Sequence, residues 1–101
     1  AARTEIVTLF AVARHLAVRQ GRRTTVAIDA RSGVASVHIG ADTVHRRDLN
    51  RAFGVSLEPT QDSMSYHPTG IGYGAANLSI RISRGAAADT VVVSRLGRVR
   101  H

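Results

Sequence analysis

The fold is decided by the opening stretch of the chain, residues 1–20, which reads AARTEIVTLFAVARHLAVRQ and is followed by Gly21. Four apolar residues recur at the spacing of one helical face: Ile6, Phe10, Ala13 and Ala17. Neither proline nor glycine interrupts the stretch, and glycine is typical of the position just past a helix end. This pattern predicts one amphipathic helix over residues 1–20, about 30 Å long. No capping residue precedes Ala1, so we expect a helix that is cut in its middle.

Beyond this helix the apolar residues alternate with polar ones, which is typical of half-buried strands. Residues 24–30 and 34–40 form two such runs on either side of a turn over residues 31–33, so they predict a β-hairpin. The side chains expected to face the core are Val26, Ile28, Ala30, Ala35, Val37 and Ile39. Residues 41–53 are polar and basic, and we interpret them as a loop with a helical turn over residues 48–53.

The second half of the chain carries further short strand patterns, at residues 55–57, 64–66, 77–83 and 90–94. Three consecutive valines predict that the last of these is the more fully buried, and residues 84–89 are expected to turn the chain before it. A helix followed by a run of strands predicts an α+β fold. We expect a long N-terminal helix packed on antiparallel sheet of six to seven short strands. At 101 residues this is a single domain, with the β part over residues 23–101.

The composition narrows the classes of function. The chain has no cysteine, which excludes a disulfide framework, a thiol nucleophile and a Cys-ligated zinc site. Its five histidines show no metal-ligand spacing, and its seven acidic residues lie scattered, mostly at predicted turns. We therefore expect no metal, no cofactor and no catalytic site.

Charge is the unusual feature of the sequence. All 14 basic residues are arginines, and the net charge is +7. They cluster at Arg22 and Arg23, at residues 46–51, and at Arg95, Arg98 and Arg100. Arg98 and Arg100 lie two apart, so an extended segment places both on one face, where they suit successive phosphates. A solvated basic terminus explains the same pattern, and the residues alone do not separate the two interpretations.

Three segments carry a resemblance to a known family. They read ARHLAVR (residues 13–19), MSYHPTG (residues 64–70) and VVVSRLGRVR (residues 91–100). In this order they resemble the soluble domains of the GspH/FimT family of type II secretion pseudopilins and type IV minor pilins. The family pattern has an AR-x-x-A helix end, an F-x-P-x-G segment and a V-S-x-x-G-R-V-R ending. Tyr66 stands where the family usually has phenylalanine.

The resemblance implies the pilin fold, in which residues 1–20 are the C-terminal half of a spine helix. It also implies a hydrophobic N-terminal half-helix, absent from this sequence, that anchors the subunit in the bacterial inner membrane and later packs in the filament core. The domain itself would then lie in the periplasm or on the filament. We expect Ile6, Phe10, Ala13 and Ala17 to pack on the sheet. The expected partners on the strands are Val26, Ile28, Leu78, Ile80 and Val92 or its neighbours.

Two functions follow from the resemblance. The first is a non-enzymatic assembly subunit near the tip of a pseudopilus or pilus, whose partners are other minor pseudopilins or pilins. The second is a minor pilin that captures double-stranded DNA for uptake. The Gly97-Arg98-Val99-Arg100 tail matches the G-R-x-R tail implicated in DNA contact in the FimT branch, and Arg95, Arg22 and Arg23 would add to it. The secretion branch often ends in a similar sequence, so the tail alone does not separate the two.

Overall fold

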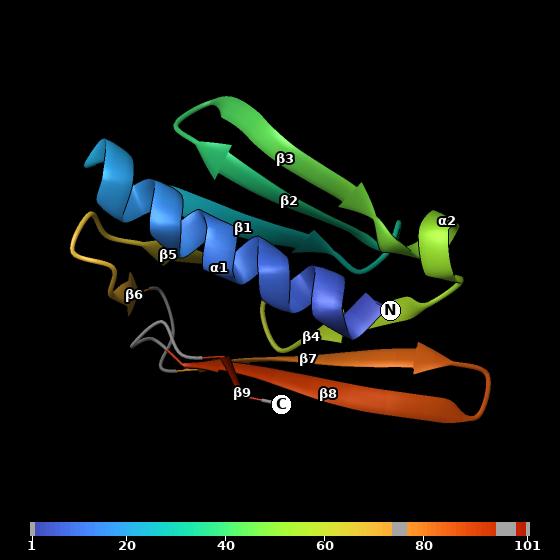
Figure 1. The fold of residues 1–101 in the computed structure, drawn as a ribbon. Helices are drawn as coiled ribbons and strands as arrows, with labels where there is room; N and C mark the ends of the chain where they lie inside the picture. The colour runs from blue at the N-terminus through green and yellow to red at the C-terminus, as the bar shows by residue number, and fades with distance from the viewer. Residues whose placement is uncertain (1, 74–76, 95–98, 101) are drawn as a thin grey trace.

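The computed structural model describes residues 2–73, 77–94 and 99–100 of the chain (Figure 1). Its main helix, α1, spans Ala2–Gln20, as the apolar stripe predicts. The helix ends at Gly21, whose φ of 61° is a left-handed conformation that glycine adopts without a steric penalty. Arg19 lies in the last turn, where its positive charge suits the negative end of the helix dipole.

The larger of two antiparallel sheets has five strands in the order β3-β2-β1-β5-β6. Their bounds are β1 (Thr24–Asp29), β2 (Val34–Ile39), β3 (Asp42–Asp48), β5 (Ser63–Tyr66) and β6 (Gly72–Tyr73). Residues on β1 alternate between buried and half-buried positions, because one face of the sheet meets α1 and the other meets solvent. Thr24, Val26 and Ile28 take the buried positions.

The smaller sheet has the order β4-β7-β8-β9. Its strands are β4 (Ser56–Pro59), β7 (Asn77–Arg84), β8 (Ala87–Ser94) and β9 (Val99–Arg100). A short helix, α2 (Leu49–Phe53), joins the two sheets. The Asp48 side chain accepts a hydrogen bond of 2.9 Å from the Arg51 backbone N–H and so caps the start of α2.

The predicted architecture is confirmed as a long helix on antiparallel sheets. Seven of the strands in the described residues have four or more residues, and β6 and β9 are two-residue pairings. The prediction of a loop over residues 41–53 is wrong for Asp42–Asp48, which form β3, and right about the helical turn that follows. The predicted turn over residues 84–89 is shorter, since β8 already begins at Ala87.

One predicted core position differs, and the structure decides between Val92 and its neighbours. Ala30 is exposed, because β1 ends at Asp29 and the chain enters the turn there. Val92 is only half-buried, while Val91 and Val93 are fully buried. The three valines therefore alternate between a buried and a half-buried face of β8, whereas their run predicted a more fully buried strand.

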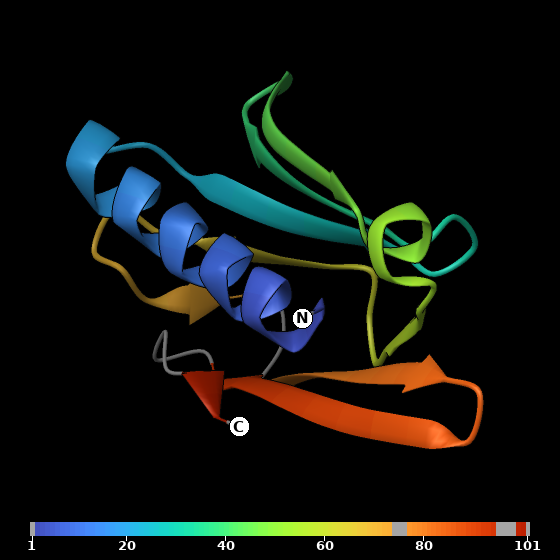
Figure 2. The same ribbon diagram turned by 45° about the vertical axis from the view of Figure 1, so that its right-hand side comes forward.

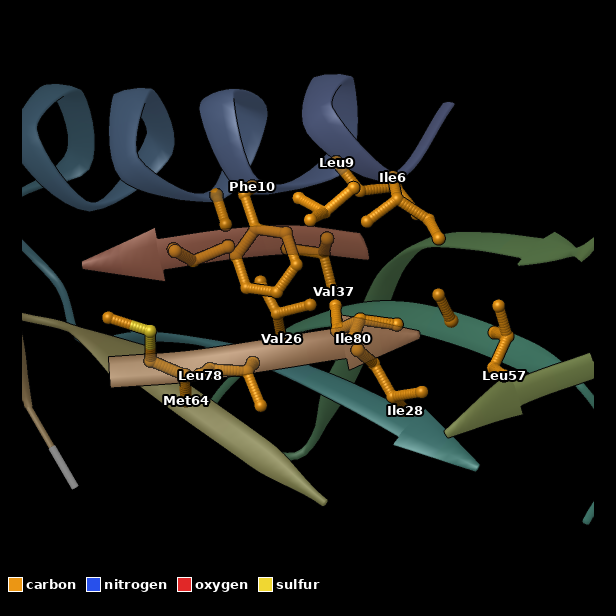
Figure 3. Close-up of a cluster of buried hydrophobic side chains, with 14 of the residues drawn as sticks. Ile6, Leu9, Phe10, Val26, Ile28, Val37, Leu57, Met64, Leu78 and Ile80 are labelled. Atoms are coloured by element: carbon orange, nitrogen blue, oxygen red, sulfur yellow. The ribbon is translucent and has the colours of Figure 1, made fainter. Parts of the chain in front are cut away.

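One hydrophobic core lies between α1 and the two sheets. Both ribbon views show α1 crossing the front of the large sheet above the β7–β8 hairpin (Figures 1 and 2). Ile6 and Phe10 are each 1% exposed, and they point from α1 into the side chains of β1, β2 and β7 (Figure 3). Ala13 and Ala17 are fully buried, and their small side chains let the helix approach the sheet closely. The strands contribute Val26, Ile28, Val37, Met64, Leu78, Ile80, Val91 and Val93.

Candidate functional site

The outward face of α1 is a continuous exposed stripe. Five of the exposed residues of α1 follow each other at helical spacing along this stripe: Thr4, Thr8, Ala11, His15 and Val18. Val18 is 51% exposed, the largest exposure among the large apolar side chains of the described residues. The stripe extends over nearly the whole length of the helix, so a neighbouring molecule can pack along it.

The last turns of α1 are tied to the loop after β5. Arg14 donates a hydrogen bond of 3.1 Å from Nε to the carbonyl oxygen of Gly70. A side chain at Gly70, where φ is 86°, would lie 3.2 Å from Val18. The loop therefore lies directly against the helix and places Ile71, which is 49% exposed, at the molecular surface. The sequence resemblance singled out residues 64–70 without predicting this contact with Arg14.

Tyr66 is the last residue of β5, directly before this loop, and is completely buried. Its hydroxyl group has no hydrogen-bond partner in the part of the chain that the structure describes. Burial raises the pKa of the Tyr66 phenol from 10.0 to about 12, because the charged form would lose its hydration, and the nearby positive charge of Arg14 opposes this rise. Phenylalanine, the residue usual in the family pattern, would fill this place without an unpaired hydroxyl.

The outer face of the large sheet is polar. Thr25 and Ser65 lie opposite each other on β1 and β5, and their hydroxyl oxygens are 2.8 Å apart. Arg23 donates to the Ser65 hydroxyl over 3.4 Å. His38 lies in the same row, with its two ring nitrogens 2.8 Å from the Ser36 hydroxyl and 3.0 Å from the Thr43 hydroxyl. These contacts place His38 in a network of hydroxyl groups.

The predicted DNA-binding arginines are only partly placed by the structure. Arg22 and Arg23 are both exposed and lie between α1 and β1. The Arg22 guanidinium approaches the β2–β3 turn, 3.2 Å from where a side chain at Gly40 would begin. Arg95 and Arg98 lie outside the described residues, and Arg100 is placed by its backbone in β9, opposite Val92. The geometry therefore does not test the tail as a unit.

Ion pairs connect the first turn of α1 with both sheets. Glu5 pairs with Arg47 on β3 at 3.2 Å, and Arg3 pairs with Asp89 on β8. The sequence analysis noted Arg47 only within the arginine cluster of residues 46–51, in a segment interpreted as a loop, and did not predict this contact. The register of β3 against β2 supplies the missing signal, since it places Arg47 opposite the buried Ala35 and hence on the helix side of the sheet.

Within residues 2–73, 77–94 and 99–100, no group of three His, Asp or Glu side chains is placed to hold a metal ion. The same residues contain no helix long and apolar enough to cross a membrane. A helix spine with one face buried on antiparallel sheets and the other exposed along its length is the architecture of a pilin-like fold.

Comparison with known proteins gives the family. A family model described as type II transport protein GspH matches residues 2–97. The chain therefore belongs to the GspH family and is a subunit of the pseudopilin and minor pilin class, whose members are structural proteins and not enzymes. Membership implies assembly with other pilins. No curated protein matches the chain significantly.

Solved structures show the same fold at low sequence identity. The type IV minor pilin FimU of Pseudomonas aeruginosa superposes with a TM-score of 0.83 at 17% identity, over 98% of this chain and 84% of that one. The minor pseudopilin EpsH of the Vibrio cholerae type 2 secretion system superposes with a TM-score of 0.72 at 12% identity, over 96% and 90% of the two chains. One relative comes from a pilus and the other from a secretion system, so the shared fold leaves that choice open.

Proposed function

We propose that the chain is a minor subunit near the tip of a type II secretion pseudopilus or a type IV pilus, where it acts by packing against other minor subunits. The observation that carries this proposal is the exposed stripe on α1 from Thr4 to Val18. The opposite face of the same helix already holds the core, so the stripe is free to pack along a neighbouring helix. The resemblance further implies anchorage in the inner membrane before assembly, with this domain in the periplasm or on the filament.

Cross-linking tests the proposal. Because this sequence contains no cysteine, each introduced thiol is the single reactive site in the domain. Thr8→Cys and His15→Cys place single thiols on the stripe, and Glu58→Cys places one on β4 as a matched exposed control. In a host that assembles the filament, a short bis-maleimide reagent should join the two stripe variants to other minor subunits carrying single cysteines on their own helices. The control should give no such product. Equal cross-linking from all three sites, or from the control alone, would contradict packing through α1.

DNA capture is the second candidate, and the observation in its favour is the charge. The net charge of +7 attracts phosphate, and Arg22 and Arg23 are exposed on the side of the molecule where α1 leads into β1. Together with the Arg95, Arg98 and Arg100 tail, they would contact the phosphate backbone of double-stranded DNA. Such binding would depend steeply on salt and weakly on base sequence.

Fluorescence anisotropy of a labelled duplex at two salt concentrations tests this second candidate. Arg98→Ala/Arg100→Ala removes the tail charges, Arg22→Ala/Arg23→Ala removes the pair before β1, and Arg81→Ala/Arg84→Ala is the charge-matched control on β7. The proposal expects loss of binding in the tail variant and retention in the control. If all variants bind alike, or none binds near physiological salt, the positive charge is incidental to function.

A further inference from the structure

The strand β3 differs from the other long strands in having no buried residue. All seven of its positions are exposed except Asp48, which is half-buried. It is the last strand of its sheet, so one side of its backbone pairs with β2 and the other lies open. The β2–β3 hairpin rises away from α1 (Figure 2), which leaves this open edge accessible. An unpaired edge is a template for another strand.

The middle of β3 carries one positive charge on each face, Arg46 and Arg47, while the negative charges of Asp42 and Asp48 lie at the two ends of the strand. Arg46 lies opposite Ser36 on the outer face, and Arg47 lies opposite Ala35 on the helix side. An incoming strand therefore meets one guanidinium above its plane and one below it. Arg46 forms no ion pair in the described part of the chain, whereas Arg47 pairs with Glu5. Val44, which is 41% exposed, adds an apolar contact where the register shifts.

We propose that β3 is an acceptor edge for an extended acidic segment of a neighbouring subunit, which adds to the large sheet as a sixth strand. This inference rests on the proposed assembly function, and it specifies the chemistry of one contact between neighbouring subunits. Backbone hydrogen bonds along the edge supply affinity, and two adjacent acidic side chains in the partner, one on each face, complement Arg46 and Arg47.

A second copy of this chain is a poor occupant of the edge. Antiparallel pairing of two β3 strands over their full length would place Asp42 of one copy opposite Asp48 of the other. A register centred on Arg46 and Arg47 would place these arginines opposite each other, and like charges in cross-strand positions are destabilising. The bulge at Val44 further interrupts the match between identical edges. The arginines therefore select a partner of opposite charge.

The test uses three capped peptides and an isotope-labelled domain observed by NMR. The acidic peptide reads Thr-Val-Glu-Glu-Val-Thr, the second replaces both glutamates with lysines, and the third is the acidic peptide N-methylated at alternate backbone amides. At millimolar concentration the acidic peptide should shift the amides of Asp42–Asp48 and slow their hydrogen exchange by about tenfold at saturation. The lysine peptide should bind at least about tenfold more weakly at low salt.

The variants and the methylated peptide separate strand addition from charge attraction. Arg46→Glu, which breaks no described ion pair, should reduce the preference for the acidic peptide, and Arg46→Glu/Arg47→Glu should reverse it. Arg19→Glu/Arg84→Glu changes the net charge equally at two exposed sites away from β3 and should leave the preference intact. The methylated peptide should lose binding, because its backbone cannot complete the ladder.

Several outcomes overturn the proposal. They are binding of the methylated peptide as strong as that of its parent, shifts confined to other elements, no preference for the acidic peptide, or no binding at several millimolar. Dimerisation through β3 in sedimentation experiments would name a second copy as the occupant instead. None of these results would affect cross-linking through α1, so a failure here is distinguishable from a failure of the assembly function.

Discussion

Two of the hairpins, β7–β8 and β2–β3, differ in whether their second strand contributes side chains to the core. In β7–β8, eight residue pairs align, and Leu78, Ile80 and Ile82 on one strand and Val91 and Val93 on the other are buried. In β2–β3, six pairs align around a bulge, and β3 contributes nothing to the core. The backbone pairing is of the same kind in both. The difference teaches that hydrogen bonds and surface contacts such as the Glu5–Arg47 ion pair hold β3 in place, whereas the β7–β8 hairpin is also held by burial of apolar surface.

The largest expected effect comes from truncating a side chain that α1 contributes to the core. Phe10→Ala should lower the free energy of unfolding by about 3–5 kcal/mol, because the ring is buried between α1 and the strands. Thr8→Ala, two residues earlier on the exposed face of α1, should change the free energy of unfolding by less than about 0.5 kcal/mol. Chemical denaturation of both variants measures the difference. A Phe10→Ala variant as stable as the parent would mean that the helix is docked in another way.

Two glycines in turns sharpen the comparison further. Gly33 and Gly85 both have positive φ, of 71° and 58°. A side chain at Gly33 would lie 2.5 Å from the Asn50 side chain in α2, while one at Gly85 in the β7–β8 turn meets nothing within 4 Å. Gly33→Ala should therefore cost about 2–4 kcal/mol, from backbone strain plus overlap, and Gly85→Ala about 1 kcal/mol from strain alone. Equal costs measured by thermal denaturation would show that α2 moves aside.

High pH should destabilise the domain through Tyr66. The pKa of Tyr66 in the folded state is raised from 10.0 to about 12. The neutral phenol therefore contributes fully to the stability of the fold below pH 10, and this contribution is lost as the pH rises to about 12. Over this range the free energy of unfolding should fall by at most about 3 kcal/mol, at ~1.4 kcal/mol per pKa unit. Denaturation at pH 8, 10 and 11.5 measures this loss.

Tyr66→Phe is the matched control, since it removes the titrating group. The variant should lose the Tyr66 part of the alkaline destabilisation. At neutral pH it should be more stable than the parent by about 1 kcal/mol, because no unpaired hydroxyl is then buried. A less stable variant would indicate that the hydroxyl has a partner, such as a bound water molecule.

The smallest effects are expected in β3. Val44→Ala should change the free energy of unfolding by less than about 0.5 kcal/mol, because Val44 is largely exposed. Backbone amides of β3 should also exchange with solvent much faster than those of β7, which native-state hydrogen exchange measures directly. Protection of β3 equal to that of β7 in the isolated domain would contradict the contrast between the two hairpins.

The same contrast explains which elements were predictable from sequence. The strand β7 is spanned by an alternation of Leu78, Ile80 and Ile82 with polar residues, so its bounds were predicted nearly to the residue. The strand β3 lacks such an alternation because neither of its faces is buried, and only its pairing partner makes it a strand. Periodicity reports burial, so it detects strands of the core and misses strands of the edge.

The candidate site likewise divides into residues that the sequence predicts and contacts that it does not. The residues of the buried helix face were predicted from their spacing, and the structure places all four in the core. The contacts between distant segments, such as Arg14 with Gly70 and Glu5 with Arg47, depend on how the elements are arranged in space. No local pattern in the sequence encodes that arrangement.

The ion pairs of the first helical turn bear on how the domain would carry mechanical load. Arg3 joins α1 to β8 in the small sheet, and Glu5 joins it to β3 in the large one. A pull applied along the helix axis from its first turn would thus be divided between the two sheets. Such surface pairs are individually weak, about 0.2–1 kcal/mol, so they would break early under tension and re-form when it is released. The buried face of α1 would bear the remaining force, because pulling the helix along its axis shears this face against the strands over its whole length.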